Sequence, residues 1–89
     1  MKIREAIKVF KKLKMKIKEG NDTLAYFYYK GELVVRSRVP HRRGELKGNL
    51  PHYVRQQLKL NEDQFRDICR CTKEYEDYLE ILTQKDLIS

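Results

Sequence analysis

The apolar residues at the start of the chain recur every three or four positions, and charged residues, several of them lysines, occupy most of the positions between them. The apolar set is Ile3, Ala6, Ile7, Phe10 and Leu13. This spacing places one apolar stripe along a helix and predicts an amphipathic helix over residues 2–14. The period then changes to two, because Met15 and Ile17 alternate with Lys16 and Lys18, which indicates a short strand.

An aromatic segment over residues 23–30 has the composition of a strand and follows a turn signal at residues 20–22. One of its faces carries Leu24, Tyr26 and Tyr28, and the other carries Ala25, Phe27 and Tyr29. Lys30-Gly31 predicts a tight hairpin, because glycine tolerates the positive φ that such a turn needs.

The return strand over residues 32–39 alternates in the same way and ends at Pro40, which cannot donate to a ladder. Its expected faces are Leu33, Val35, Ser37 and Val39 on one side, and Val34, Arg36 and Arg38 on the other. The faces therefore differ in charge as well as in hydrophobicity, and the two arginines stand together.

Three helices are predicted after a basic loop at residues 41–48. The first has Asn49 at its N-cap, because asparagine accepts hydrogen bonds from the free N–H groups of a first turn. The second begins at Asn61, whose spacing to Gln64 is that of a capping box. Thr72 is the expected cap of the last helix.

The order of these elements predicts an α+β domain with an α-β-β-β-α core, in which three antiparallel strands form one sheet. We expect residues 1–60 to form this core, and residues 61–89 to form a helical, acidic C-terminal extension packed on the same domain. A chain of 89 residues has room for one domain with a modest core.

The positive charge is concentrated in the first two thirds of the chain. The net charge is +7, from 20 Lys and Arg against 13 Asp and Glu. Residues 1–60 contain 16 basic and 5 acidic side chains, whereas residues 61–89 contain 4 basic and 8 acidic ones. This clustering indicates a surface that binds a polyanion, and nucleic acid is the polyanion we expect. A solvated surface without a partner is the alternative.

Several other classes of protein and site are disfavoured. No apolar run approaches the roughly 20 residues of a membrane span, and residues 1–12 lack the apolar stretch of a signal peptide, so we expect a cytoplasmic protein. The spacing of Cys69 and Cys71 suits neither a disulfide framework nor a zinc site, and we expect two reduced thiols. We expect no metal and no cofactor.

Cations cluster around the end of the return strand, and Lys30 adds one more in the hairpin turn. We expect them to contact successive phosphates, because the planar arginine fork donates bidentately to phosphate oxygens. The candidate nucleic-acid-binding residues are Lys30, Arg36, Arg38, His41, Arg42, Arg43 and Lys47. An exposed strand face with salt bridges to Glu32 or Glu45 is the alternative interpretation.

Aromatic rings and histidines could add to this patch. Exposed rings stack the bases of single-stranded RNA, but one face of the strand over residues 23–30 must pack against helices, so only alternate rings are free. His41 in the basic loop and His52 in a helix are the candidate acid–base groups of a metal-independent ribonuclease. Two surface histidines without catalytic function are the alternative.

Short motifs spread over residues 2–60 are similar to those of a known family. They are Arg4-Glu5-Ala6-Ile7-Lys8, Gly20, Val39-Pro40-His41, Glu45-Leu46-Lys47-Gly48-Asn49-Leu50 and Arg55-Gln56-Gln57-Leu58. Together they resemble the HicA-type toxins of toxin–antitoxin pairs. The resemblance implies a double-stranded-RNA-binding-like fold, mRNA interferase activity and a HicB-like antitoxin as partner.

One position departs from the family. Where the family has its catalytic histidine, this chain has Asp22 or Thr23, and neither exchanges protons near neutrality as imidazole does. His41 is the histidine that matches one of the family. The resemblance therefore implies an RNA-binding protein with weak or no cleavage of RNA.

Two alternative functions stay open. One is an active mRNA interferase with a non-standard acid–base group, and the other is a protein-interaction module whose basic face receives an acidic antitoxin-like partner. A further hypothesis concerns the extension, whose acidic side chains could fold against the basic patch and screen it from RNA. These side chains are Glu74, Glu76, Asp77 and Glu80.

Overall fold

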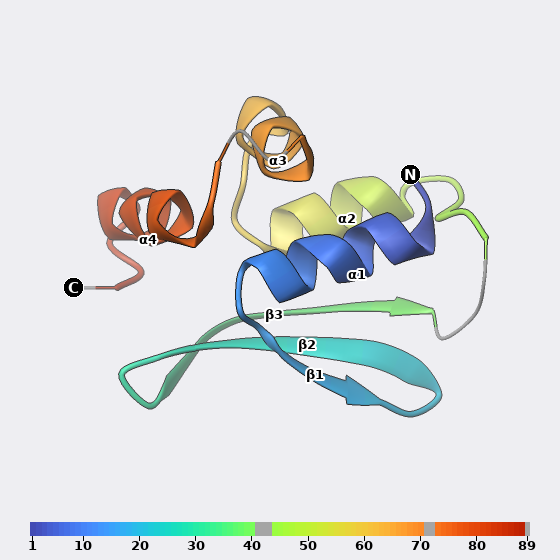
Figure 1. Ribbon diagram of the computed structural model, residues 1–89, viewed down its shortest axis with the longest axis horizontal. Coiled ribbons are helices and arrows are strands. Elements are labelled where there is room, and N and C mark those ends of the chain that lie inside the picture. Colours follow the sequence, from blue (N-terminus) through green and yellow to red (C-terminus); the bar gives the residue numbers. More distant parts are fainter. Residues whose placement is uncertain (41–43, 71–72, 89) are drawn as a thin grey trace.

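The computed structural model of the chain describes residues 1–40, 44–70 and 73–88, and these residues form two layers. One layer is an antiparallel sheet of β1 (Lys16–Glu19), β2 (Asp22–Tyr29) and β3 (Glu32–Pro40), in the order β1-β2-β3. The other layer contains the helices, which lie on the same face of the sheet (Figure 1). They are α1 (Ile3–Lys12), α2 (Leu50–Gln57), α3 (Glu62–Cys69) and α4 (Tyr75–Gln84). The predicted α+β class and the three-stranded antiparallel sheet are confirmed.

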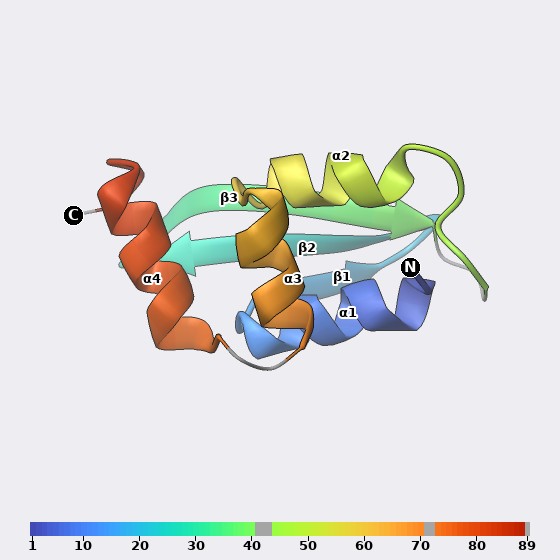
Figure 2. The same ribbon diagram turned by 90° about the horizontal axis from the view of Figure 1, so that it is seen from above.

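The helices divide the covered face of the sheet among them. α1 packs over β1 and β3, and α2 lies along β3. α3 packs against α1, and α4 crosses the end of the sheet that holds the β2–β3 turn (Figure 2). With every described helix on one side, no helix of the described residues covers the opposite face of the sheet.

The alternation predicted for β2 decides which side chains are covered. Thr23, Ala25 and Phe27 are buried under the helices, whereas Leu24, Tyr26 and Tyr28 are partly or fully exposed. Because successive side chains of a strand point to opposite faces, the second set belongs to the open face. The two faces predicted for this strand are confirmed over residues 23–28.

A β-bulge changes the faces of the return strand near its start. Phe27 pairs with Val35 but Tyr28 pairs with Leu33, so Val34 is an extra residue on β3. Leu33 is consequently 47% exposed and lies opposite Tyr28, while Val34 packs against the core. The predictions that Leu33 shares a face with Val35, and Val34 with Arg36, are wrong, because the extra residue reverses the alternation.

Two reversals of the chain depend on residues with positive φ. Lys14 has a φ of 57° just after α1 and turns the chain toward β1, so the helix is shorter than the predicted 2–14. Lys30 and Gly31 have φ values of 51° and 82° and form a two-residue loop between paired residues Tyr29 and Glu32. This is the loop that the right-handed twist of a hairpin favours, and it confirms the predicted turn.

The helix caps agree only in part with the prediction. Asn61 and Gln64 form the predicted capping box, with N–H···O distances of 3.0 and 2.8 Å. Asn49 stands at the N-cap of α2, but its side chain makes no cap hydrogen bond, because its ψ of 4° is not the extended value from which such a side chain reaches the first turn.

The cap of α4 differs from the prediction as well. Glu74, not Thr72, precedes the first helical residue, and its N–H donates to Asp77 Oδ2 at 2.8 Å. Thr72 itself lies outside the described residues. The negative charge of Asp77 in the first turn is also attracted to the positive end of the helix dipole, which stabilises α4 further.

Tyr78 of α4 joins the C-terminal helices to the rest of the core. Its side chain is completely buried, and its ring meets the ring of Phe27 edge-on at 5.1 Å between centroids. Its hydroxyl donates to the carbonyl oxygen of Leu58, at the end of α2, at 2.8 Å. One side chain therefore connects α4, β2 and α2, which lie far apart in the sequence.

Removing the Tyr78 hydroxyl is expected to destabilise the fold. Tyr78→Phe keeps the ring contact with Phe27 but leaves the Leu58 carbonyl without its buried donor, which costs about 1–2 kcal/mol. Urea denaturation at neutral pH measures this loss as a lower midpoint with an unchanged slope. An unchanged free energy of unfolding would contradict the assigned hydrogen bond.

The same hydroxyl predicts a loss of stability in alkali. Burial raises the pKa of the Tyr78 phenol above its ordinary value of 10.0. The folded state therefore keeps this proton at a pH where the unfolded state releases it, so the free energy of unfolding falls as pH rises above about 10. Denaturation at several alkaline pH values should show a steeper fall for the wild type than for Tyr78→Phe, by about 1.4 kcal/mol per pH unit. Parallel curves would refute this linkage.

Candidate nucleic-acid interface

The open face of the sheet carries two rows of side chains in which cations flank a β2 residue. In the first row, Lys16 of β1 and Arg36 of β3 both pair with Tyr26. Directly paired residues share a face and have Cβ atoms about 5 Å apart, so the tyrosine stands between two cations. The second row repeats this order with Lys18, Leu24 and Arg38.

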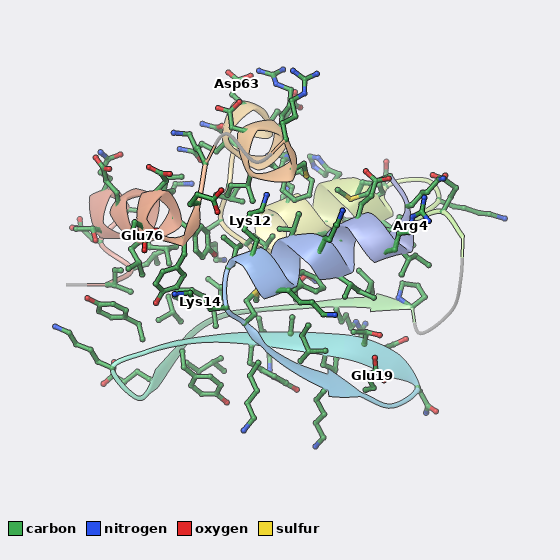
Figure 3. All side chains as sticks on the ribbon, in the orientation of Figure 1. Arg4, Lys12, Lys14, Glu19, Asp63 and Glu76 are labelled. Carbon is green, nitrogen blue, oxygen red and sulfur yellow. The ribbon has the colours of Figure 1, made fainter. Side chains whose placement is uncertain are left out.

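We name these six residues the cation–aromatic platform. Its four cationic side chains are exposed, while Leu24 and Tyr26 are half-buried between them. Figure 3 shows side chains extending from the sheet on the side away from the helices. The aliphatic stems of lysine and arginine cover apolar surface while their charged ends stay in water, which explains why this face needs no helix to cover it.

Aromatic and aliphatic surface continues the platform toward the hairpin turn. The ring of Tyr28 lies 6.5 Å from that of Tyr26, and its side chain is 49% exposed. Its cross-strand partner is Leu33, which the β-bulge turns onto this face. The open face thus has a cationic end and an apolar end, with Tyr26 at the boundary.

The charge of the platform is largely unneutralised. Among the described residues, no ion pair involves Lys16, Lys18 or Arg36. Arg38 Nη1 lies 3.8 Å from Asp22 Oδ2, and the two side chains are 69% and 44% exposed. The attraction within such an exposed ion pair is weak, so Arg38 stays available to a ligand. The predicted alternative, salt bridges from the strand to Glu32 or Glu45, does not occur within the described part of the chain, where Glu45 pairs with the N-terminus instead.

The structure separates the candidate binding residues that the sequence grouped together. Arg36 and Arg38 share the platform, but Lys30 lies in the β2–β3 turn, roughly 20 Å along β3 from Arg38, and its Nζ is 5.4 Å from the centre of the Tyr29 ring. Lys47 is exposed in a segment that pairs with the first residues of the chain, on the helix side. His41, Arg42 and Arg43 lie outside the described residues.

Three exposed residues on or near the platform were not among the sequence candidates. Lys16 and Lys18 were recognised as strand positions, but their place on the platform depends on β1 lying beside β2. Tyr53 of α2 was not a candidate either, and its side chain is 52% exposed. Strand neighbours and helix orientation are tertiary properties, and the local pattern carries no signal for either.

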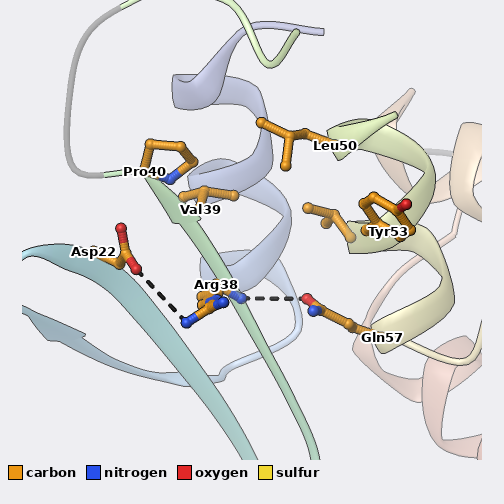
Figure 4. A pocket seen from close by; sticks show the side chains of 8 residues that line it. Asp22, Arg38, Val39, Pro40, Leu50, Tyr53 and Gln57 are labelled. Atoms are coloured by element: carbon orange, nitrogen blue, oxygen red, sulfur yellow. Dashed lines mark hydrogen bonds and ion pairs between the residues drawn. The ribbon is translucent and has the colours of Figure 1, made fainter. Parts of the chain in front are cut away.

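A groove follows the free edge of β3, where the strand meets α2. Gln57 of α2 closes its floor: its Oε1 accepts from Ser37 Oγ at 2.7 Å and from the Arg38 N–H at 3.4 Å. On either side of this contact lie two hollows, of about 420 and 290 Å³. Arg38 and Gln57 line both, so the hollows connect the platform with α2 (Figure 4).

His52 lies away from this groove. The residues of α2 that line the groove are Leu50, Tyr53, Val54 and Gln57, and His52 falls on the opposite side of the helix. Its Nδ1 is 2.7 Å from Arg55 Nη2, and since arginine only donates, this nitrogen is the acceptor. Arg55 also donates to the Leu60 carbonyl, so the contact orients both side chains within α2.

The acidic side chains of the extension lie in the helix layer. Glu74, Glu76, Asp77 and Glu80 belong to α4 or its cap, and α4 covers the face of the sheet opposite the platform (Figures 1 and 3). No ion pair joins them to Arg36 or Arg38 in the described ranges. The structure therefore contradicts the hypothesis that they screen the strand arginines.

Neither related proteins nor a metal site identifies the function of this surface. No family model, curated protein or solved structure matches the chain. Residues 1–40, 44–70 and 73–88 contain no group of His, Cys, Asp and Glu that could hold a metal. Within these ranges no helix has the length and apolar character needed to cross a membrane. Cys69 is half-buried, and Cys71 lies outside the described residues.

The contact between Gln57 and Ser37 is expected to stabilise the edge of β3. Gln57→Leu leaves the buried Ser37 hydroxyl without an acceptor and should cost about 1–2 kcal/mol in urea denaturation. In a Ser37→Ala background the same substitution should cost clearly less, because no buried hydroxyl is left unpaired. Equal costs in both backgrounds would show that the two side chains are not coupled.

Proposed function

We propose that this chain binds RNA and that the cation–aromatic platform holds the bound strand. The observation that carries the proposal is the position of Tyr26, which stands between Lys16 and Arg36 on the face of the sheet that no described helix covers. Cations on both sides of a half-buried ring supply two phosphate contacts and one stacking surface at the same place.

The ligand that suits this surface best is single-stranded. Base stacking on Tyr26 and Tyr28 requires bases that have left a duplex, and a flat sheet has no element that enters a groove of double-stranded nucleic acid. RNA is favoured over DNA by the resemblance of the chain to HicA-type toxins. By the same resemblance we propose that it acts in a toxin–antitoxin pair.

We propose that the protein binds RNA without cleaving it efficiently. The position of the family's histidine is taken by Asp22 or Thr23, and His52 faces away from the groove. General acid–base catalysis needs a proton-exchanging group within hydrogen-bonding reach of the reacting atoms. Among the described residues the platform offers lysines, arginines and a tyrosine, which suit charge neutralisation and stacking better than proton transfer near neutrality.

Substitutions on the platform are expected to weaken RNA binding in two distinguishable ways. Arg36→Gln should remove one phosphate contact and lower the slope of log K against log salt by about 0.7. Tyr26→Leu should lower the affinity about tenfold or more without changing this slope, because stacking carries no counterion release. Fluorescence anisotropy with a single-stranded RNA of about 12 nucleotides measures both quantities.

Arg4→Gln is the matched control for Arg36→Gln. It removes the same charge from an exposed position of α1, in the helix layer (Figure 3). If RNA binds at the platform, the Arg4 variant keeps the wild-type salt dependence apart from a small change in overall field. Equal losses in the Arg4 and Arg36 variants would reduce the binding to non-specific attraction and overturn the proposed surface.

A further inference from the structure

The groove at the free edge of β3 continues directly from the platform. Its first hollow is lined by Tyr26 and Arg36 of the platform, and its second by Tyr53 of α2 and Asp22 of β2. A strand of RNA that follows the first hollow past Arg38 therefore reaches the second. At about 290 Å³, this second hollow is near the lower limit of small-molecule sites, which suits a single base better than a longer segment.

Tyr53 gives the second hollow an aromatic wall. It is one of the most exposed large apolar side chains of the described chain, at 52%, and Leu50 and Pro40 border the hollow beside it (Figure 4). Exposed tyrosine next to apolar neighbours is a stacking surface that accepts any base. The ring therefore provides affinity, and any choice among bases must come from polar groups.

Gln57 lines the hollow and carries hydrogen-bond donors that no described residue satisfies. The Arg38 backbone N–H can only donate, so the oxygen of the Gln57 amide must be the atom that faces it. The amide nitrogen consequently points the other way, and its N–H groups have no acceptor among the described residues. Arg38 adds further donors on the adjacent side of the groove.

Asp22 presents the complementary acceptor. Its carboxylate lines the same hollow and is held 3.8 Å from Arg38, with 44% of its side chain exposed. An ionised carboxylate has only acceptor sites and two oxygens with which to bind paired donors. The hollow therefore offers an aromatic wall, a bidentate acceptor, and donors from Arg38 and Gln57.

We propose that this hollow binds one guanine base of the single-stranded RNA, an inference that rests on the proposed function. Guanine carries N1–H and the N2 amino group side by side, which match the two oxygens of Asp22, and O6 and N7 acceptors, which match Arg38 and Gln57. Adenine and cytosine offer one amino group, and uracil places carbonyl oxygens on both sides of its single N–H. None of these satisfies the carboxylate with two donors.

The test compares guanosine with inosine, which lacks only the N2 amino group. Wild-type protein should bind an oligouridine with one central guanosine about tenfold more tightly than the same RNA with inosine. In Asp22→Asn this ratio should fall close to one, because a side-chain N–H replaces one acceptor oxygen. Tyr53→Leu should weaken binding of both RNAs several-fold while a preference for guanosine persists.

Glu19→Gln is the matched control, since it neutralises an exposed carboxylate on the other side of the β1–β2 turn and outside both hollows. It should keep the wild-type ratio, whereas a general charge effect would alter Glu19 and Asp22 variants alike. Thermal unfolding confirms that each variant is folded. Equal wild-type affinity for the guanosine and inosine RNAs overturns this inference alone. Failure to bind any of these RNAs overturns the proposed function together with it.

Discussion

A chain of this size can cover only one face of its sheet. The apolar residues of the helices cover the inner face of the sheet, where Phe10, Phe27 and Tyr78 belong to one core and have no exposed surface or almost none. The outer face must then be compatible with water, and alternation along the strands supplies the residues that make it so. Long cationic side chains meet that requirement and at the same time concentrate positive charge on a flat surface. The proposed interface is thus a direct consequence of how little core the chain can build.

The C-terminal helices complete this one-sided arrangement. α4 adds Tyr78 and Leu82 to the same core that α1 and β2 form, and the hydroxyl of Tyr78 fixes the end of α2. The position of α2 in turn sets where Gln57 and Tyr53 stand along the free edge of β3. The acidic helix α4 therefore affects the groove indirectly, because Tyr78 holds the end of α2 in place. Among the residues that the structure describes, it forms no ion pair with Arg36 or Arg38.

The sequence predicted the parts of the fold that depend on local periodicity. The faces of β2, the hairpin at Lys30-Gly31 and the capping box at Asn61 all follow from short-range spacing. The predictions fail where the structure is decided by contacts between strands that are distant in the sequence. The extra residue Val34 moves Leu33 to the open face, and the register in which β1 pairs with β2 places Lys16 beside Tyr26. Neither event leaves a trace in the pattern of neighbouring residues, because both are decided by how strands meet.

The bulge at Val34 has a consequence for the durability of the surface. Alternation alone rules out a shift of one residue between two strands, but a shift of two residues preserves it. A bulge breaks that equivalence, because its extra residue fits at one place only and Val34 is anchored against the core. The bulge thereby fixes the register of β2 and β3, and with it the pairing of Tyr26 with Arg36. The side chains of the open face consequently keep one arrangement.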